Sequence, residues 1–208
     1  MIVLKIVLIG DGGVGKTAIR ESYLGHGFES QYVMTIGADF AMQDDIVNGR
    51  KLRYQIWDLA GQDRFDGVRN VYYRGAKGSL LIFDVTRPDS YFNIPKWVKE
   101  LWGFNGQGKI PIVLVANKID LRELSDGEII SPDQGRKMAE KLTKLTSKEG
   151  FACHYIETSA KTGVKIQDAF SLLSENVMNL AEKRGLLKLK SSRPKSSLER
   201  QSIVKQLQ

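Results

Sequence analysis

A glycine-rich stretch near the N-terminus, Gly10–Thr17, has the residue types of a phosphate-binding loop. It follows the apolar, β-branched run Ile2–Ile9, which predicts a buried strand, and it precedes Ala18–Leu24, which predicts a helix. Glycines let successive backbone N–H groups point into one anion-sized hollow at a helix N-terminus. Lys16 adds a positive charge for the outer phosphates, and the Thr17 hydroxyl is a ligand for Mg²⁺. A plain glycine-rich turn is the alternative, which the order of strand, lysine, threonine and helix disfavours. The predicted phosphate cradle comprises Gly12, Gly13, Val14, Gly15, Lys16, Thr17 and Ala18.

A second group of residues predicts the chemistry that acts on the outer phosphate. Asp58 follows the apolar run Leu52–Trp57, where a carboxylate can reach Mg²⁺ through water, and the Gly61 N–H can meet a γ-phosphate. Gln62 is then placed to orient an attacking water, because phosphoryl transfer depends mainly on positioning and electrostatics. Asp-x-x-Gly alone is a weak turn pattern. Its position one hairpin after the phosphate loop favours the functional interpretation.

Two short motifs at the ends of later strands predict a guanine site. The first, Asn117–Asp120, follows the buried run Ile112–Val115, and the second is Thr158–Lys161. The Asp120 carboxylate can accept hydrogen bonds from N1–H and the exocyclic amine of guanine, whereas adenine has no donor at N1. A carboxylate left unpaired is costly, so such a site discriminates strongly. The supporting residues are Asn117, Lys118, Ser159, Ala160 and Lys161, with the Ala160 N–H directed at guanine O6.

Alternating strands and helices must position these motifs. Strands are expected at 2–9, 40–47, 52–57, 78–84, 112–115 and 152–157, and helices at 18–24, 90–102, 131–147 and 165–183. Asn48-Gly49 predicts a hairpin turn, and the segments 26–37 and 58–75 are expected to be irregular. The pattern predicts an α/β fold: a mostly parallel six-stranded sheet with one antiparallel edge strand and helices on both faces. Ligands bind beyond the carboxyl ends of such strands, where the polar motifs fall.

Length and charge divide the chain into two parts. Its 208 residues allow one well-buried domain, expected over 1–182, and a basic tail over 183–208. No apolar run reaches the roughly 18 residues that span a bilayer, and the single cysteine, Cys153, fits a reducing cytosol. The tail holds eight Lys or Arg and one acid, which accounts for the whole net charge of +7. The body is therefore neutral, and nucleic acid is not an expected partner.

Taken together, the motifs resemble those of the Ras superfamily of small GTPases, and most closely its Rab branch, over residues 2–182. The Rab-like stretches are Thr35–Phe40, Trp57–Phe65 and Tyr72–Gly78. This resemblance implies a P-loop NTPase G domain that binds GTP or GDP with Mg²⁺, hydrolyses GTP slowly and acts as a monomeric switch. It also implies an exchange factor, a GTPase-activating protein and effectors, in membrane trafficking or a related process. No arginine of the switch segments is an obvious catalytic finger, and Gly12 leaves room for one supplied by an activator.

The resemblance also assigns individual residues. It makes Thr35 the threonine that closes on Mg²⁺ and γ-phosphate, Phe28 the aromatic side chain across the guanine and Tyr32 a cover for the phosphates. The implied catalytic set is Lys16, Thr35, Gly61 and Gln62, and the implied Mg²⁺ set is Thr17, Thr35 and Asp58. The aromatic residues that Rab effectors read correspond to Phe40, Trp57 and Tyr72, for which core packing around the hairpin is the alternative.

Two departures from the family pattern affect the expectations. Leu59 stands where the family usually has threonine, which leaves the roles of Asp58 and Gln62 intact. The last residues, Lys205–Gln208, include no cysteine, so prenylation is not expected, and Ile2 argues against N-myristoylation. We therefore expect a cytoplasmic protein. Its tail is either a solvated, disordered segment, a weak contact with anionic lipid on the cytoplasmic face of a membrane, or a binding segment for RNA or another acidic partner.

Two other functions are compatible with the phosphate loop. A scaffold could stay loaded with guanine nucleotide without cycling, and an ATP-using phosphotransferase could share the same loop. Asp120 argues against the phosphotransferase because adenine cannot pair with its carboxylate.

Overall fold

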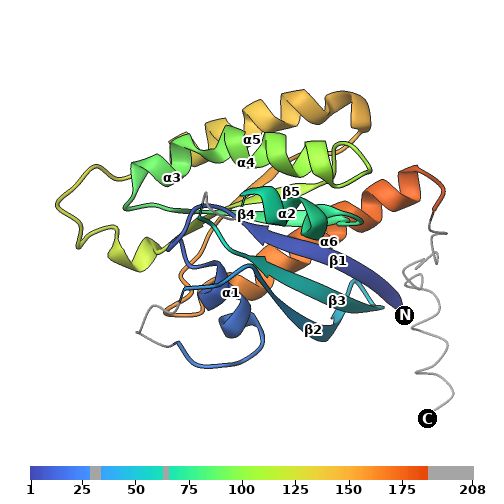
Figure 1. Cartoon of the computed structure of the whole chain (residues 1–208), viewed down its shortest axis with the longest axis horizontal. Coiled ribbons are helices and arrows are strands. Elements are labelled where there is room, and N and C mark those ends of the chain that lie inside the picture. Colours follow the sequence, from blue (N-terminus) through green and yellow to red (C-terminus); the bar gives the residue numbers. More distant parts are fainter. Residues whose placement is uncertain (29–33, 63–65, 187–208) are drawn as a thin grey trace, which may run out of the picture.

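The computed structural model describes residues 1–28, 34–62 and 66–186. A six-stranded sheet in the order β2-β3-β1-β4-β5-β6 forms its centre (Figure 1). Neighbouring strands are parallel, except that β2 and β3 form an antiparallel hairpin at one edge. This confirms the predicted α/β class. The strands are β1 (Ile2–Ile9), β2 (Ala38–Val47), β3 (Arg50–Leu59), β4 (Gly78–Asp84), β5 (Ile112–Asn117) and β6 (His154–Glu157).

Helices cover both faces of the sheet, as the pattern predicts. The side chains of α1 and α6 pack into one apolar core, and those of α2, α3, α4 and α5 pack into the other. The helices are α1 (Lys16–Tyr23), α2 (Asp66–Tyr73), α3 (Pro88–Phe92), α4 (Ile94–Phe104), α5 (Pro132–Thr146) and α6 (Ile166–Lys183), with the short 3₁₀ helices η2 (Ile119–Leu121) and η3 (Ser147–Glu149). Within the described ranges, no helix has the length and apolar character needed to cross a membrane.

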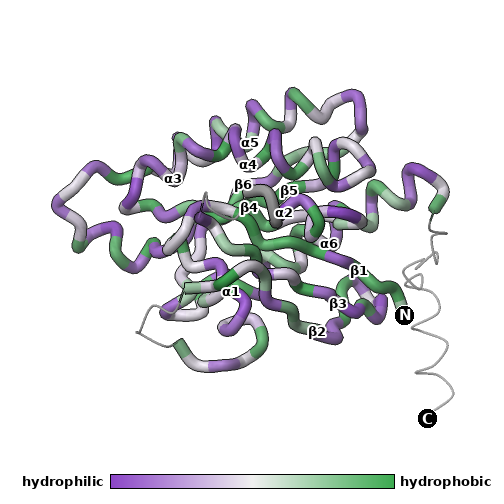
Figure 2. The backbone as a smooth tube through the Cα atoms, viewed as in Figure 1, coloured by the Kyte–Doolittle hydropathy of each residue, from purple (hydrophilic) through white to green (hydrophobic). Residues whose placement is uncertain are grey.

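The central strand β1 shows why the sheet holds the phosphate loop firmly. Successive side chains of a strand point to opposite faces, so Ile6 and Leu8 enter the core under α1 and α6, while Val7 and Ile9 enter the other core. All four are fully buried, and each contributes about 2 kcal/mol of apolar burial. Figure 2 shows the apolar residues concentrated along the central strands. The loop after β1 therefore starts from one of the best-packed points of the molecule.

The structure differs from the sequence expectation at two helices. Asp66–Tyr73 is helical, although the stretch 58–75 lacks clear periodicity. The helix expected at 90–102 divides into α3 and α4 around Asn93. Pro95 explains the division, because it has no N–H for the fourth carbonyl before it and its ring clashes there. The predicted hairpin turn is confirmed, since Asn48 and Gly49 adopt φ of 51° and 72° between β2 and β3.

Candidate functional site

The phosphate loop between β1 and α1 depends on glycine at defined points. Gly10 has φ of +133°, and a side-chain carbon there would lie 2.0 Å from the carbonyl oxygen of Ile82. Gly15 has φ of +97°, and a side-chain carbon there would lie 2.4 Å from Asn117 Nδ2. The backbone therefore turns tightly against two neighbouring strands. Only glycine permits both the left-handed conformation and the close approach.

Lys16 lies inside this loop. Its ammonium donates hydrogen bonds to the carbonyl oxygens of Gly10 and Asp11, each across 2.7 Å. Burial lowers the pKa of Lys16 to about 8, although the carboxylates of Asp58 and Asp11 act in the opposite direction. Among the described residues, the hydrogen-bond acceptors of this buried ammonium are loop carbonyls, so it is well placed for an anionic ligand.

A cavity of about 670 Å³ opens beside the loop, a size typical of small-ligand sites. A groove of about 710 Å³ between α5 and β6 is lined by none of the predicted site residues that the structure describes. The wall of the 670 Å³ cavity also includes Arg20, Glu21 and His26, to which sequence analysis gave no role. Predicted site residues in this wall are Gly12, Gly13, Gly15, Lys16, Thr17, Ala18, Phe28, Thr35, Gly61, Gln62 and Lys118.

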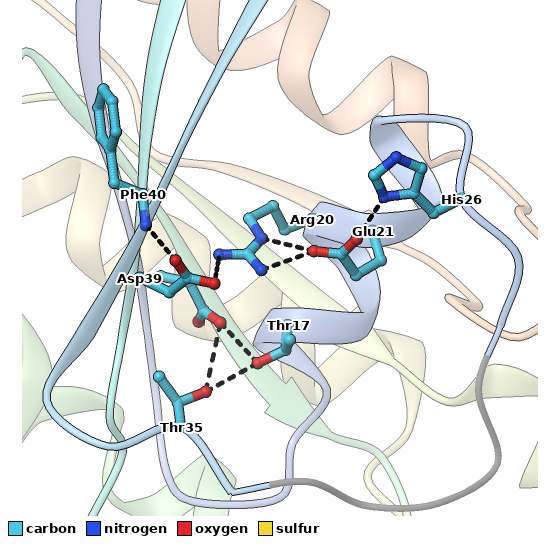
Figure 3. A network of polar contacts seen from close by, with 8 residues as sticks. Thr17, Arg20, Glu21, His26, Thr35, Asp39 and Phe40 are labelled. Atoms are coloured by element: carbon cyan, nitrogen blue, oxygen red, sulfur yellow. Dashed lines mark hydrogen bonds and ion pairs between the residues drawn. The ribbon is translucent and has the colours of Figure 1, made fainter.

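Thr17 and Thr35 line this cavity (Figure 3), and both contact the buried carboxylate of Asp58. The Thr17 hydroxyl lies 2.5 Å from Asp58 Oδ2 and 3.0 Å from the Thr35 hydroxyl, which is 3.4 Å from the same carboxylate oxygen. Asp58 is fully buried, and its Oδ1 has no hydrogen-bond partner in the described chain. Burial raises the pKa of Asp58, against the hydrogen bond from Thr17 and the charge of Lys16. Hydroxyl and carboxylate oxygens are hard ligands, so this set and its unpaired oxygen fit Mg²⁺.

Gly61 and Gln62 lie directly against the phosphate loop. A side-chain carbon on Gly61 would come within 2.4 Å of Lys16 Nζ, and one on Gly12 would lie 3.4 Å from Gln62 Cγ. The Gln62 amide nitrogen contacts Met34 Sδ. The structure therefore brings Gln62 to the loop, and its predicted role in orienting water remains a prediction.

Arg69, a buried arginine that the sequence did not single out, contacts the backbone of Gln62. Arg69 donates to the carbonyl oxygens of Ala60 and Gln62 at 3.1 and 2.8 Å and pairs with Glu100 at 2.9 Å. Its guanidinium also lies over the Trp97 ring, 4.5 Å from the centroid. One arginine in a charged segment gives no sequence signal that distinguishes it from a surface residue. Its position depends on contacts between α2 and α4.

The Asn117 amide connects the predicted guanine motifs to the phosphate loop. Its nitrogen donates to the Val14 carbonyl across 2.9 Å. Its oxygen accepts hydrogen bonds from the Thr158 hydroxyl at 3.2 Å and the Ala160 N–H at 3.1 Å. The Ala160 N–H therefore has a protein partner here, and its contact with guanine O6 remains a prediction.

The carboxylate predicted to recognise the base is oriented by the second motif. The Ser159 hydroxyl donates to Asp120 Oδ1 across 2.6 Å, which leaves Oδ2 for another donor. Lys118 has φ of 67°, and its ammonium pairs with Asp84 at 2.7 Å. Lys161 is exposed. Of the residues in the two guanine motifs that the structure describes, Lys118 belongs to the cavity wall, and Asn117 contacts the phosphate loop through its bond to Val14.

The remaining aromatic predictions have different outcomes. Phe28 lines the cavity with 47% of its surface exposed, and Tyr32 lies outside the described residues. Phe40 of β2, Trp57 of β3 and Tyr72 of α2 form a row, with successive ring centroids 4.9 and 5.5 Å apart. They pack together while Phe40 stays 41% exposed, so both interpretations of the three rings remain open.

Comparison with known proteins agrees with this geometry. The family model described as Ras family matches residues 5–179. Ras-related protein RGP2 of Oryza sativa subsp. japonica is 36% identical over 182 residues, 88% of this chain and 78% of the relative. Ras-related protein Rab7 of Drosophila melanogaster is 34% identical over 85% of this chain and 81% of its own length. Ras-related protein Rab-10 of Caenorhabditis elegans is 37% identical over 84% and 80%, respectively. The chain therefore belongs to the Ras family and is a Rab-like small GTPase, a hydrolase.

Proposed function

We propose that this protein is a molecular switch that binds GTP and GDP with Mg²⁺ and hydrolyses GTP slowly. The observation that carries the proposal is that Thr17 and Thr35, in the wall of the cavity beside Lys16, lie within 2.5 to 3.4 Å of each other and of Asp58. These residues come from α1, from the segment before β2 and from β3. A threonine from the segment before β2 would couple that segment to the outer phosphate.

The residues divide the work of phosphoryl transfer. Lys16 and the loop N–H groups stabilise charge on the phosphates, and Thr17, Thr35 and Asp58 hold Mg²⁺, directly or through water. When bound, Mg²⁺ neutralises charge that develops on the transferring group. Gln62 orients the attacking water, and the Gly61 N–H binds the γ-phosphate.

Guanine recognition and slow turnover follow from other contacts. Asp120, oriented by Ser159, accepts the two donors of the guanine edge, and Phe28 covers the base. Arg20 lines the cavity and Arg69 contacts Gln62, and each of these arginines is paired with a carboxylate. This pairing supports slow intrinsic hydrolysis and an activating protein that supplies an arginine.

We extend the proposal to the chain's surroundings. Residues 1–182 form the GTPase domain, and Phe40, Trp57 and Tyr72 form part of an effector surface. The protein acts as a cytoplasmic monomer in membrane trafficking or a related process, and the basic tail from residue 183 contacts an anionic membrane surface. The relatives named Rab7 and Rab-10 support the trafficking role.

The test is a single-turnover assay on the full chain loaded with GTP. Addition of Mg²⁺ should start conversion of bound GTP to GDP, and Gln62→Leu should slow it about a hundredfold with nucleotide still bound. If Gln62→Leu cleaves GTP as fast as the parent, the assigned role is wrong. If GTP persists in the parent even with cell extract added, the protein is a non-cycling scaffold.

A further inference from the structure

Arg20 is a buried cation in the cavity wall that the proposed mechanism does not use. It lies on α1, one turn after Thr17, with 7% of its surface exposed. Its guanidinium lies 2.6 Å from Asp39 Oδ2 and 2.6 Å from Glu21 Oε1 (Figure 3). Burial opposes its charge, but the hydrogen bond to Glu21 and the close negative charge of Asp39 outweigh that cost and raise the pKa of Arg20. It therefore bridges α1 and β2 as a permanent cation.

Each of the two carboxylates that contact Arg20 also contacts one further group through its second oxygen. Asp39 Oδ1 accepts the Phe40 N–H across 2.7 Å. Glu21 Oε2 lies 2.5 Å from His26 Nδ1. The contacts form one continuous chain from His26 through α1 to Phe40 on the sheet edge. The nucleotide cavity and Phe40, the exposed member of the aromatic row, thus share one set of polar contacts.

The same contacts fix the segment that carries Thr35. One hydrogen bond and one ion pair hold the residues just after it. The Ala60 N–H donates to the Gly37 carbonyl across 2.8 Å, and Asp39 pairs with Arg20. Thr35 stands in contact with Thr17 and Asp58 in this arrangement. Its hydroxyl is thus placed by anchors two and four residues further along the chain.

We propose that Arg20 is a positioning residue for the nucleotide switch: its ion pair with Asp39 holds the start of β2 against α1, so that Thr35 meets Thr17 and Asp58. This inference rests on the proposed function and identifies what keeps the Mg²⁺ ligands assembled. The same pair fixes Phe40 through Asp39, so it also links the state of the nucleotide site to the aromatic row.

The two partners of the ion pair are not equivalent, which makes the proposal testable. The Arg20 side chain is 8% exposed and that of Asp39 is 59% exposed. Removing Arg20 lets Asp39 return to water, so the main loss is the positioning contact. Removing Asp39 instead leaves a buried cation neutralised by Glu21 alone, which is the costlier change. Arg20→Leu, which keeps the apolar stem, is therefore the cleaner variant.

The first measurement is the release rate of a fluorescent GDP from the full chain with Mg²⁺ and excess unlabelled GDP. Arg20→Leu should release it about tenfold faster than the parent, and Arg20→Lys should restore part of the difference. The matched control is Arg50→Leu, which removes the Arg50–Glu182 pair of 2.6 Å, with side chains 19% and 18% exposed, between β3 and α6. This control should stay within about twofold of the parent.

The second measurement reads the position of Thr35 directly. The γ-phosphate ³¹P resonance of a bound, slowly hydrolysed GTP analogue differs between engaged and disengaged threonine, and Thr35→Ala gives the disengaged reference. In Arg20→Leu the resonance should move toward that reference, and in Arg50→Leu it should match the parent. Loss of a merely structural ion pair would lower thermal stability without this movement.

The outcomes separate this inference from the proposed function. If the parent retains labelled GDP while Arg20→Leu matches it in release rate and ³¹P resonance, the positioning role is wrong. Equal effects of Arg20→Leu and Arg50→Leu also overturn it. A parent that binds no labelled GDP overturns the proposed function together with this inference.

Discussion

The indole nitrogen of Trp97 donates a hydrogen bond to Asp11 Oδ1 across 2.7 Å and so ties helix α4 to the phosphate loop. The Trp97 ring also stacks against the Arg69 guanidinium, which donates a hydrogen bond to the Gln62 carbonyl. One buried side chain therefore supports both the loop that binds phosphate and the residue predicted to orient water.

Trp97→Phe should keep the ring under Arg69 and lose the bond to Asp11. We expect a loss of about 2 kcal/mol in the free energy of unfolding, because the acceptor is a carboxylate, together with a lower single-turnover rate of GTP cleavage. Trp102→Phe is the matched control, since Trp102 lies on the same helix and donates to the Ile110 carbonyl across 3.1 Å. Equal cleavage rates in the two variants would contradict the prediction.

Arg87→Ala should weaken nucleotide binding through the phosphate loop. Arg87 donates to the Gly12 carbonyl across 2.6 Å. The Gly13 N–H belongs to the same trans peptide and points the opposite way, so fixing the carbonyl also fixes the donor. We expect about tenfold weaker GDP binding in a fluorescence titration. Arg136→Ala, which removes an exposed pair with Asp133, should leave affinity unchanged. The same affinity in both variants would rule out this role for Arg87.

Nucleotide binding should take up protons on the alkaline side of neutrality. The pKa of Lys16 is about 8 in the protein without nucleotide, and bound phosphates favour the ammonium and raise that pKa. The complex therefore holds more protons than the free protein at about pH 8.5, and affinity falls as pH rises above about 8. Calorimetric GDP titrations in two buffers of different ionisation enthalpy measure the uptake. Lys16→Met should abolish it, whereas Lys141→Met, on the exposed face of α5, should not; absence of uptake in the parent would refute the assignment.

Two helical glycines should respond oppositely to alanine. No atom of the described residues, apart from its chain neighbours and its own helix backbone, lies within 4 Å of a side-chain carbon added to Gly103 on α4, so Gly103→Ala should stabilise the protein by about 0.5 to 1 kcal/mol. A side-chain carbon on Gly135 would lie 2.1 Å from the Tyr155 ring. Gly135→Ala should therefore destabilise the protein by about 1 to 3 kcal/mol. Thermal unfolding of both variants checks the prediction, and stabilisation by Gly135→Ala would show that α5 packs differently against β6.

The sequence was sufficient to predict where the motifs converge, because parallel strands place their carboxyl ends at one edge. Thr17 and Asp58 meet for this reason, although 41 positions separate them. The partners of Arg20 and Arg69 could not be predicted in the same way. A pairing such as Arg20 with Asp39 depends on the angle between α1 and β2, and a charged residue has the same sequence pattern whether it is buried or solvated. The prediction of one helix over 90–102 missed the break at Pro95, although proline in a helix interior removes a hydrogen bond.

The hairpin register has a consequence far from its turn. Asp39 stands directly opposite Asp58 in the antiparallel pairing, and the two-residue turn at Asn48 and Gly49 sets that alignment. Because side chains alternate along a strand, a turn insertion that shifted this register by one residue would move every position of one strand to the wrong face. The turn lies nine residues from Asp39, about 30 Å along the strand. The length of this turn therefore constrains the site. An insertion at the turn that shifts the register would separate Asp39 from Asp58, although every site residue would be unchanged.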